Sequence, residues 1–449
     1  MRKIRGVFPP HNKNTDHSKF KIMPVPAEVH IPMNMHTGTP AVPVVKVGDS
    51  VRVGQLIGEA TEYVSSPVHA SVSGVVKSIN DRDFVTGQKA VSITIASDGK
   101  QTMYEGLKIP TVTNLQEFLD AVRDSGSIGM GGAGYPTAPK LTIKNVNKLD
   151  YILVNGAECE PYVTADSRAM VGGAEFIYEG VHLLKRFYNP EHVMICIEDN
   201  KPEAIERMKE IFAADDDIKV SVLPSMYPQG ERKVLVYNVT GRVVPEGARL
   251  QDVGCIVINC TTVTVFSRYI KLGVPLIQKI VTVDGPAVKT PKNVLAPIGT
   301  PIRELFEFCG GFVDSDPKKI LMGGPMMGIA LPSIDMPVVK TTNAVLAFSE
   351  KDAAIPPETA CIRCGRCLNK CPMSLMPPSV ETALSLNKPE IMERHKVDLC
   401  VECGCCAYVC PAKRHLVQVM QMSKKMLWAY KSAKKAEREK KAKEANKDG

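Results

Sequence analysis

The stretch GMGGAGYPTAPK spans residues 129–140 and decides how the central part of the chain folds. Gly129, Gly131 and Gly134 fit G-x-G-x-x-G, the turn that brings backbone close to a dinucleotide phosphate. A dinucleotide fingerprint continues directly into a helix, whereas two prolines follow here, and proline is tolerated only in the first helical turn. The glycines therefore predict a backbone nest for an anion, and the prolines argue against the usual dinucleotide-binding turn. A plain tight turn is the alternative that the loop alone leaves open.

Helix-like and strand-like segments alternate around this loop. In order they are a helix over 115–126, a strand over 151–156, a helix over 169–187, a strand over 192–199 and a helix over 202–213. Such alternation predicts a parallel sheet covered by helices. Ligands of an open parallel sheet bind beyond the carboxyl ends of its strands, where Asn155, Glu158 and Glu160 follow the first strand. An acidic cap on a solvated loop is the alternative interpretation of the two carboxylates.

Nine of the fourteen cysteines lie between residues 361 and 410. CIRCGRCLNKCP and CVECGCCAYVCP both follow C-x2-C-x2-C-x3-C-P, the spacing of bacterial [4Fe–4S] ferredoxins, in which the fourth cysteine ligates the other cluster. The spacing predicts one cluster on Cys361, Cys364, Cys367 and Cys410, and a second on Cys400, Cys403, Cys406 and Cys371. Structural zinc, which is usually held by two pairs of ligands, is the alternative.

Residues 373–398, between the two cysteine runs, have the pattern of two helices and predict an α-helical ferredoxin domain. Cys405 lies between two predicted ligands, and we expect it to pack near a cluster without ligating it. The five cysteines outside this region are expected to be small buried hydrophobic residues.

The charge of the 449-residue chain is concentrated at one end. Ten Lys or Arg and four Asp or Glu lie between Lys424 and Gly449, so this tail carries +6 of the formal +8. A nearly neutral body argues against nucleic-acid binding. We find neither a signal-peptide pattern nor an apolar stretch of about 18 residues, and therefore expect no transmembrane segment. The basic tail fits a solvated helix or docking to an acidic subunit or anionic membrane, and both remain open.

The chain divides into five predicted segments. They are a β-rich N-terminal domain over 1–112, the α/β domain over 113–270, a compact β-grasp module over 271–350, the cysteine-rich domain over 351–422 and the basic helical tail over 423–449. The first segment resembles the biotinyl/lipoyl hammerhead fold. The hairpin tip after Val68 reads His69-Ala70-Ser71 and has no carrier lysine, so we expect a structural role there.

The glycine loop and the stretch NGAECEP (155–161) together resemble the FMN- and NADH-binding subunit of respiratory complex I. The order of hammerhead, flavin domain, β-grasp module and paired ferredoxin motif resembles the C subunits of Rnf complexes along nearly the whole chain. Rnf is a membrane ferredoxin:NAD oxidoreductase that couples electron transfer to Na⁺ or H⁺ transport. The resemblance implies a multidomain α/β fold with a Rossmann-like FMN/NADH domain and an SLBB-like β-grasp module. It also implies FMN, NAD(H) and two [4Fe–4S] clusters as cofactors.

The resemblance assigns site residues position by position. It places FMN on Gly129, Gly131, Gly132, Gly134, Lys140, Asn155, Glu158, Glu231, Asn259 and Thr262. It places NADH on Tyr135 and Glu160. No catalytic acid or base is implied, because the hydride chemistry belongs to the cofactors. Met130 stands where complex I has an arginine, and Arg232 stands where it has a glutamate.

The resemblance further implies an oxidoreductase and translocase subunit that is peripheral to the cell membrane on its cytoplasmic face. Its partners would be the other subunits of the complex, including a ferredoxin-like iron–sulfur subunit, with ferredoxin reached indirectly and no nucleic acid. Two other functions fit the same motifs. One is a soluble flavin/iron–sulfur NADH reductase such as a cobalamin reductase, and the other is an electron-relay subunit with an empty flavin site.

Overall fold

The computed structural model of the chain describes residues 5–84, 87, 89–143, 146–313 and 317–445. The chain forms two compact units. One contains Met1–Pro9, Met226–Val234 and Ile355–Gly449, and the other contains Pro10–Ser225 and Leu235–Ala354.

The centre of the larger unit is a four-stranded parallel sheet. Its strands are β9 (Tyr151–Gly156), β10 (His192–Glu198), β11 (Ile218–Leu223) and β12 (Cys255–Asn259), in the order β11-β10-β9-β12. The helices around it are α1 (Leu115–Asp124), α2 (Thr137–Leu141), α3 (Ala165–Gly172), α4 (Ala174–Tyr188), α5 (Pro202–Ile211), α6 (Arg232–Thr240) and α7 (Cys260–Leu272). The alternation predicted from the sequence is therefore present.

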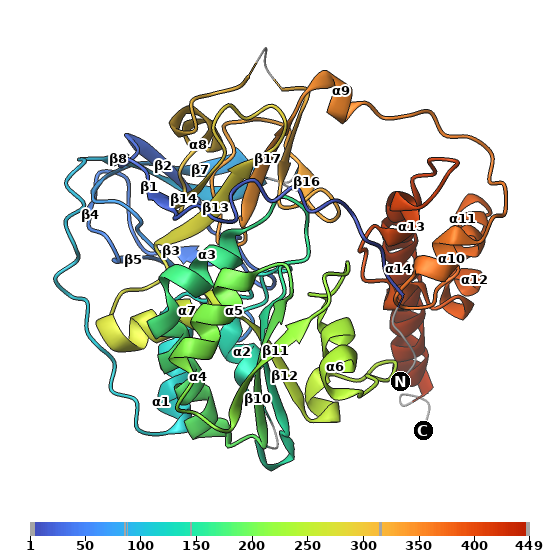
Figure 1. Cartoon of the computed structure of the whole chain (residues 1–449), viewed down its shortest axis with the longest axis horizontal. Coiled ribbons are helices and arrows are strands. Elements are labelled where there is room, and N and C mark those ends of the chain that lie inside the picture. The colour runs from blue at the N-terminus through green and yellow to red at the C-terminus, as the bar shows by residue number, and fades with distance from the viewer. Residues whose placement is uncertain (1–4, 85–86, 88, 144–145, 314–316, 446–449) are drawn as a thin grey trace. The chain divides into compact units, whose positions relative to one another are not determined.

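Both faces of this sheet are covered. Ile152 and Val154 of β9 face a core that includes residues of α1, α4, α5 and α7, and Figure 1 shows α3, α4, α5 and α7 together on one side of the strands. Leu153, which points the other way, packs with Leu235 and Val236 of α6. A strand buried on both faces is apolar without alternation, which is why YILV is a continuous hydrophobic run.

One predicted helix is wrong in its extent. The sequence pattern predicts a single helix over 169–187, whereas the structure divides this region into α3 and α4 at Gly173. Gly173 leaves the helical conformation with φ −128° and ψ 26°, and the adjacent Gly172 and Gly173 provide no side chains to hold the helix together there. The predicted helix over 115–126 ends slightly early, before Gly126 with φ +70°.

Two small sheets form the N-terminal part. One has the order β2-β8-β7-β4, and the other has the order β3-β5-β6. Their bounds are β2 (Glu28–Pro32), β3 (Val42–Pro43), β4 (Ser50–Val51), β5 (Leu56–Glu59), β6 (Val68–His69), β7 (Gly74–Asp83) and β8 (Lys89–Ser97). Val29, Ile57 and Ile95 belong to the buried core that these sheets share with the module described next.

That module is a six-stranded sheet of order β1-β14-β13-β17-β15-β16. The strands are β1 (Lys21–Ile22), β13 (Gln278–Asp284), β14 (Lys292–Pro297), β15 (Lys319–Met322), β16 (Ile329–Ala330) and β17 (Ala344–Phe348), and α8 (Ile302–Phe308) follows β14. The central pair β13 and β17 is parallel, and the pairs on either side of it are antiparallel. This is the strand order expected of a β-grasp, extended at one edge by β1.

The smaller unit is built from short helices around the cysteines. They are α10 (Arg366–Lys370), α11 (Pro377–Ser385), α12 (Pro389–Arg394), α13 (Cys405–Tyr408) and the long α14 (Leu416–Ala445), whereas the short α9 (Glu350–Ala353) belongs to the larger unit. The two helices α11 and α12 lie between the cysteine runs, as the sequence predicts. Val380, Met392 and Leu427 form the core between them and α14.

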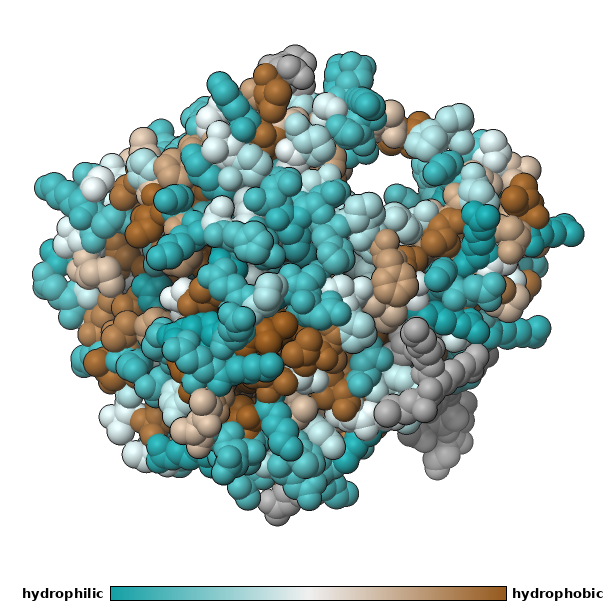
Figure 2. Space-filling view, in the orientation of Figure 1, coloured by the Kyte–Doolittle hydropathy of each residue, from teal (hydrophilic) through white to brown (hydrophobic). Residues whose placement is uncertain are grey.

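The predicted boundary between the cysteine-rich domain and the tail falls inside α14. Met420 and Leu427 of this helix are buried in the same core, so its first three turns belong to the cysteine-rich domain. From Lys431 to Lys440 every residue is exposed. In the part of the chain that the structure describes, none of the helices combines the length and apolar character needed to cross a membrane. Figure 2 shows hydrophilic side chains interspersed with smaller hydrophobic groups over the face in view.

Candidate cofactor sites

The glycine loop lies at the switch point of the parallel sheet, where the order in which strands are added reverses. The chain proceeds from β9 outward to β10 and β11, and then returns to place β12 on the other side of β9. Asn155 and Asn259 pair at the carboxyl ends of β9 and β12. A Cβ built on Gly131 would lie 2.9 Å from Nδ2 of Asn259, so the loop passes directly over this switch point. Open α/β sheets bind their ligands in this position.

The loop is fixed from below by Thr262 of α7. The Thr262 hydroxyl donates to the carbonyl of Ile128 (3.0 Å) and accepts from the N–H of Met130 (3.0 Å). Thr262 is 1% exposed and both bonding roles of its hydroxyl are used. In this structure the Thr262 hydroxyl holds the loop, and its contact with flavin stays a prediction. Met130 is also buried, so it contributes its backbone and not its side chain to the surface of the loop.

The upper part of the loop presents free backbone donors. Among the described residues, the N–H groups of Gly131, Gly132, Ala133 and Gly134 have no hydrogen-bond acceptor in the protein. Gly131, Gly132 and Ala133 are exposed. Consecutive N–H groups without partners form an anion nest, and unpaired backbone donors are otherwise uncommon. The loop therefore fits the phosphate of a flavin mononucleotide.

Glycine is favoured at two positions of the loop for different physical reasons. At Gly134 the backbone has φ +65° and an added Cβ would lie 2.9 Å from Cγ2 of Thr341, so the protein itself requires glycine. At Gly132 no atom lies within 4 Å of an added Cβ and φ is not positive. Neither strain nor a protein neighbour requires glycine at 132, which is consistent with a ligand that approaches the backbone closely.

Asp166 organises the polar side chains at the switch point, and the sequence analysis missed it. Its carboxylate accepts from Nδ2 of Asn259 (2.7 Å) and from the hydroxyl of Thr261 (2.6 Å). Asn259 in turn caps α7 by accepting from the N–H of Thr262 (3.2 Å). Because Asp166 places a negative charge beside the N-terminus of α7, the glycine loop is the better phosphate site. The acidic residue at the start of α3, in TADSR, was the available signal.

Glu158 acts as the cap of α3. Its two carboxylate oxygens accept from the N–H groups of Asp166 (2.6 Å) and Ser167 (3.2 Å). Burial raises the pKa of Glu158 to about 7, and the nearby Lys13 ammonium opposes this rise. Lys13 donates to the carbonyls of Glu158 (3.1 Å), Glu160 (3.0 Å) and Val163, which fixes the NGAECEP loop. Glu158 therefore caps α3 from a buried loop, and its contact with flavin stays a prediction.

Glu160 is also bound within the protein. Its carboxylate accepts from the N–H groups of Met326 (3.0 Å) and Met327 (2.9 Å) in the β-grasp module. Backbone donors therefore contact both oxygens in this structure, and the orientation of Glu160 toward a nucleotide stays a prediction. Tyr135 is 38% exposed beside the loop, where an aromatic ring can stack on a ligand. Lys140 lies on α2, the helix that follows the loop.

Glu231 belongs to the smaller unit, within Met226–Val234. Its carboxylate accepts from the N–H groups of Lys233 (2.8 Å) and Val234 (3.0 Å) at the start of α6. Burial raises the pKa of Glu231, and these N–H groups lower it. Its predicted contact with flavin stays a prediction.

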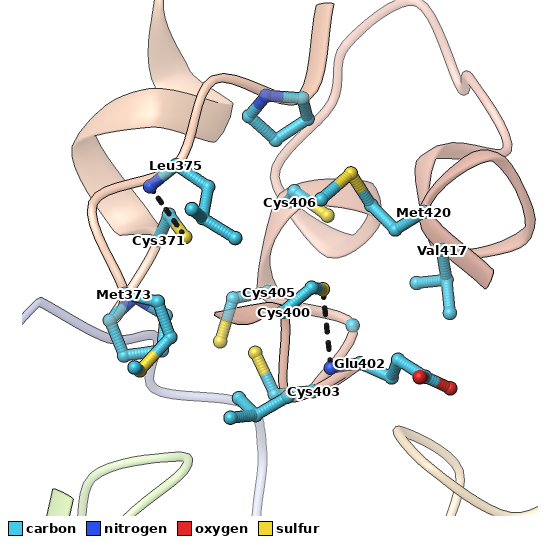
Figure 3. A pocket seen from close by; sticks show the side chains of 14 residues that line it. Cys371, Met373, Leu375, Cys400, Glu402, Cys403, Cys405, Cys406, Val417 and Met420 are labelled. Carbon is cyan, nitrogen blue, oxygen red and sulfur yellow. Dashed lines mark hydrogen bonds between the residues drawn. The ribbon is translucent and has the colours of Figure 1, made fainter. Parts of the chain in front are cut away.

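One pocket is surrounded by the second cysteine run, apart from its last cysteine, and by the last cysteine of the first run (Figure 3). This pocket, of about 380 Å³ of empty space, is lined by Cys371, Cys400, Cys403, Cys405 and Cys406 together with apolar side chains such as Leu375 and Met420. Thus Cys371 lies with the second run, as the interleaved arrangement requires. Among the described residues, the structure has no group of three or more His, Cys, Asp or Glu side chains that could hold a single metal ion. A cubane cluster distributes its four thiolates over separate irons, so the four cysteines fit that group.

Backbone donors point at the cysteine sulfurs of this pocket. The N–H of Leu375 lies 3.3 Å from Sγ of Cys371, and the N–H of Glu402 lies 3.4 Å from Sγ of Cys400 (Figure 3). Such hydrogen bonds stabilise thiolates and tune cluster potentials. Cys405 is fully buried, and its Sγ lies 3.8 Å from the carbonyl of Tyr227, to which it can donate. Hydrogen bonding to Cys403 raises the pKa of Cys405.

The other four predicted ligands are more exposed. Cys361 and Cys364 are exposed, Cys410 is half-buried and Cys367 is buried. The N–H of Thr359 donates to the carbonyl of Ala412 (3.0 Å), which brings the segment before Cys361 to the segment after Cys410. Burial raises the pKa of Cys367, and repulsion from Cys410 and Cys364 adds to this rise. Cys410 of the second run therefore lies near the first run, just as Cys371 of the first run lies near the second.

Four family models match the chain in the order that its folds suggest. They are the RnfC barrel sandwich hybrid domain over residues 2–100, the Nuo51 FMN-binding domain over 122–267, the SLBB domain over 280–330 and the 4Fe-4S dicluster domain over 360–413. The fold and these domains define a flavin- and iron–sulfur-containing oxidoreductase subunit.

Curated relatives identify the family. The chain is 42% identical to the C subunit of the proton-translocating ferredoxin:NAD(+) oxidoreductase complex of Clostridium ljungdahlii, over 83% of this chain and 82% of that protein. It is 38% identical to the Na(+)-translocating counterpart of Acetobacterium woodii, over 88% of both chains. The chain therefore belongs to the family of Rnf complex C subunits. Among solved structures, an NAD+-reducing [NiFe]-hydrogenase in the H2-reduced state is 16% identical with a TM-score of 0.49, over 70% of this chain and 62% of that one, a likeness too low to carry an argument.

Proposed function

We propose that this chain is the NAD(H)-reacting subunit of an ion-translocating ferredoxin:NAD(+) oxidoreductase complex. The observation that carries the proposal is the presence, in one chain, of an unpaired N–H nest at the sheet switch point and an interleaved cysteine pocket. Bound FMN would exchange a hydride with NAD(H) and pass single electrons to the iron–sulfur clusters. The roles of the protein's own residues are binding and orientation.

On the flavin side, the chain's task is to bind and orient. The N–H groups of Gly131 to Gly134 hold the phosphate, and Asn155 and Asn259 lie at the strand ends where polar groups can reach the flavin. Gly129 and Lys140 complete the proposed cradle at the two ends of the loop, and Glu231 remains assigned to a flavin contact. Thr262 and Glu158 remain assigned to flavin contacts, and together with Asp166 they also hold the loop and the strand ends in place.

For the nicotinamide nucleotide, the exposed Tyr135 is the proposed stacking residue. Glu160 is proposed to act through the turn at Met326 and Met327, whose backbone it fixes. This assignment gives the β-grasp module a defined role, since it keeps the NGAECEP loop at the edge of the site.

On the iron–sulfur side, we assign two [4Fe–4S] clusters with interleaved ligands. One would be held by Cys361, Cys364, Cys367 and Cys410, and the other by Cys400, Cys403, Cys406 and Cys371. Interleaving ties the two clusters to the same small core, which favours electron transfer between them. Cys405 would stay a protonated neighbour.

The partners follow from the family. We propose that the chain assembles with the other subunits of the membrane complex, including a ferredoxin-like iron–sulfur subunit, and exchanges electrons with ferredoxin only through them. It would be bound at the cytoplasmic face of the membrane. The match of residues 2–100 to the RnfC barrel sandwich hybrid domain favours this function over a soluble cobalamin-type reductase. The side chain of Met130 is buried and the glycine loop keeps exposed backbone, which supports a flavin-binding loop against the third alternative.

Activity of the isolated chain tests this proposal. After anaerobic loading with iron, sulfide and FMN, the full chain should reduce ferricyanide with NADH, and this activity should be lost when FMN is omitted. A chain that binds FMN but does not oxidise NADH would contradict the proposed reaction with NAD(H). A chain that holds the clusters but takes up no FMN would be the electron-relay subunit.

A further inference from the structure

The glycine loop is bound by a residue of the N-terminal domain. The N–H of Thr37 donates to the carbonyl of Gly134 (3.0 Å), and the hydroxyl of Thr37 donates to the carbonyl of Ala133 (2.6 Å). Thr37 is 96 residues away from Ala133 in sequence. The contact of Thr37 with this loop was not predicted from the sequence.

Thr37 is itself held in a fixed turn. The N–H of Thr39 donates to the carbonyl of Val64 (3.0 Å), the Ser65 hydroxyl donates to the carbonyl of Thr39 (2.8 Å), and Nε2 of His36 accepts from the N–H of Ser66 (3.1 Å). Three bonds therefore tie the turn to residues 64–66 of the same domain. A donor on such a turn can set the orientation of the loop that it contacts.

The planarity of the peptide bond decides what this contact does. In a trans peptide unit the carbonyl of one residue and the N–H of the next point in opposite directions. When the Thr37 hydroxyl holds the carbonyl of Ala133 on one side, the N–H of Gly134 must point to the other side. The Thr37 N–H orients the N–H of Tyr135 in the same way through the carbonyl of Gly134.

We infer that Thr37 is a positioning residue, supplied by the N-terminal domain, that aims the backbone donors of the glycine loop at the flavin phosphate. The inference rests on the proposed function, since it assumes FMN at this loop. It gives the N-terminal domain a direct part in cofactor binding. The hydroxyl matters separately from the backbone, because it alone holds the peptide between Ala133 and Gly134.

Three variants of the full chain test the inference. Thr37→Val removes the hydroxyl and keeps the shape, Thr37→Ser keeps the hydroxyl, and Thr39→Val is the matched control, since no hydrogen bond of its side-chain hydroxyl occurs among the described residues. Each flavin-depleted chain is titrated with FMN and with riboflavin, which lacks the phosphate, and flavin fluorescence is followed. Thermal unfolding checks that the folds are equivalent.

We expect Thr37→Val to weaken FMN binding about twofold to tenfold, the effect of one hydrogen bond, and to leave riboflavin binding unchanged. Thr37→Ser and Thr39→Val should bind FMN like the unchanged chain. Equal FMN affinity of Thr37→Val and Thr39→Val would overturn the inference and leave the proposed function intact. An equal loss for riboflavin, or a loss in Thr37→Ser, would also overturn it. Failure of the unchanged chain to bind FMN would overturn the proposed function instead.

Discussion

At the scale of single residues, a substitution at Gly132 should affect ligand binding without affecting folding. An added methyl group at 132 meets no protein atom, so Gly132→Ala should change the free energy of unfolding by no more than about 0.5 kcal/mol. The same methyl group would occupy the space of the phosphate and should weaken FMN binding at least about tenfold. Fluorescence titration and thermal unfolding measure the two effects.

Gly131→Ala is the contrasting variant to Gly132→Ala. Its Cβ would lie 2.9 Å from Asn259 Nδ2, so this change should lower the melting temperature as well as the affinity. If Gly132→Ala binds FMN as tightly as the unchanged chain, the loop is not the phosphate cradle.

Lys340 is a buried cation without a carboxylate partner among the described residues. Its Nζ donates to the Ser66 hydroxyl (3.0 Å) and to the carbonyls of Pro67 (2.6 Å) and Gly126 (2.7 Å). Burial lowers the pKa of Lys340 to about 7. Burial and the Lys340 charge lower the pKa of His69 to about 3 and that of His36 to about 4, so neither histidine titrates near neutral pH.

The lowered pKa of Lys340 predicts a pH-dependent stability. Between pH 7 and about 10 the unfolded chain keeps the Lys340 proton and the folded chain loses it, so this group's contribution to stability rises with pH and is lost as pH falls through 7. Relative to Lys340→Met, the unchanged chain should gain about 1 kcal/mol per pH unit in that window. Thermal unfolding of both chains at pH 7, 8 and 9 measures the difference. A constant difference would show that Lys340 stays charged in the folded chain.

Sequence patterns identified local features of the candidate site but not the distant partners of its side chains. The glycine spacing and the strand ends at Asn155 and Asn259 are local features, and the structure brings them together. Glu160 and Thr262 are bound to Met326 and Met130, which are distant in sequence, and no local pattern shows such partners. Thr37 was missed for the same reason.

At the scale of elements, the two cysteine runs should exchange their fourth ligands. Cys371 lines the pocket of the second run, so Cys371→Ser and Cys400→Ser should each remove the same cluster. The electron paramagnetic resonance spectrum of the reduced protein should then be the same in both variants. Cys410→Ser should instead remove the cluster of the first run. The cluster of the second run would then remain and give a different spectrum.

Cys405→Ser is the control for these variants. It lines the same pocket, and as a neighbour that does not ligate it should leave both clusters in place. If Cys371→Ser instead removes the cluster that Cys364→Ser removes, the ligands are not interleaved.

The elements themselves were well predicted where burial is strong. YILVNG is a strand from its first residue to its last because both of its faces are buried. The division of residues 165–188 into α3 and α4 was missed, because the apolar spacing continues through Gly172 and Gly173 and only the backbone breaks. The continuation of α14 from the cysteine-rich domain into the tail was missed because composition changes near Lys424 while the helix does not end.

At the scale of the whole molecule, the order of the parts was readable because each part carries its own periodicity or spacing. The contacts between those parts were not readable from the sequence. Lys340 and Thr37 connect the N-terminal domain to the glycine-loop segment, and Glu160 connects the NGAECEP loop to the β-grasp module. We therefore expect flavin binding to depend on these contacts between segments of the larger unit.

The cofactor content of the full chain tests the central claim most directly. After anaerobic preparation, iron, acid-labile sulfide, zinc and FMN are quantified against protein. We expect about eight irons and eight sulfides per chain, together with one FMN that Gly132→Ala binds more weakly. Zinc in place of iron, or a chain without bound FMN, would contradict the central claim.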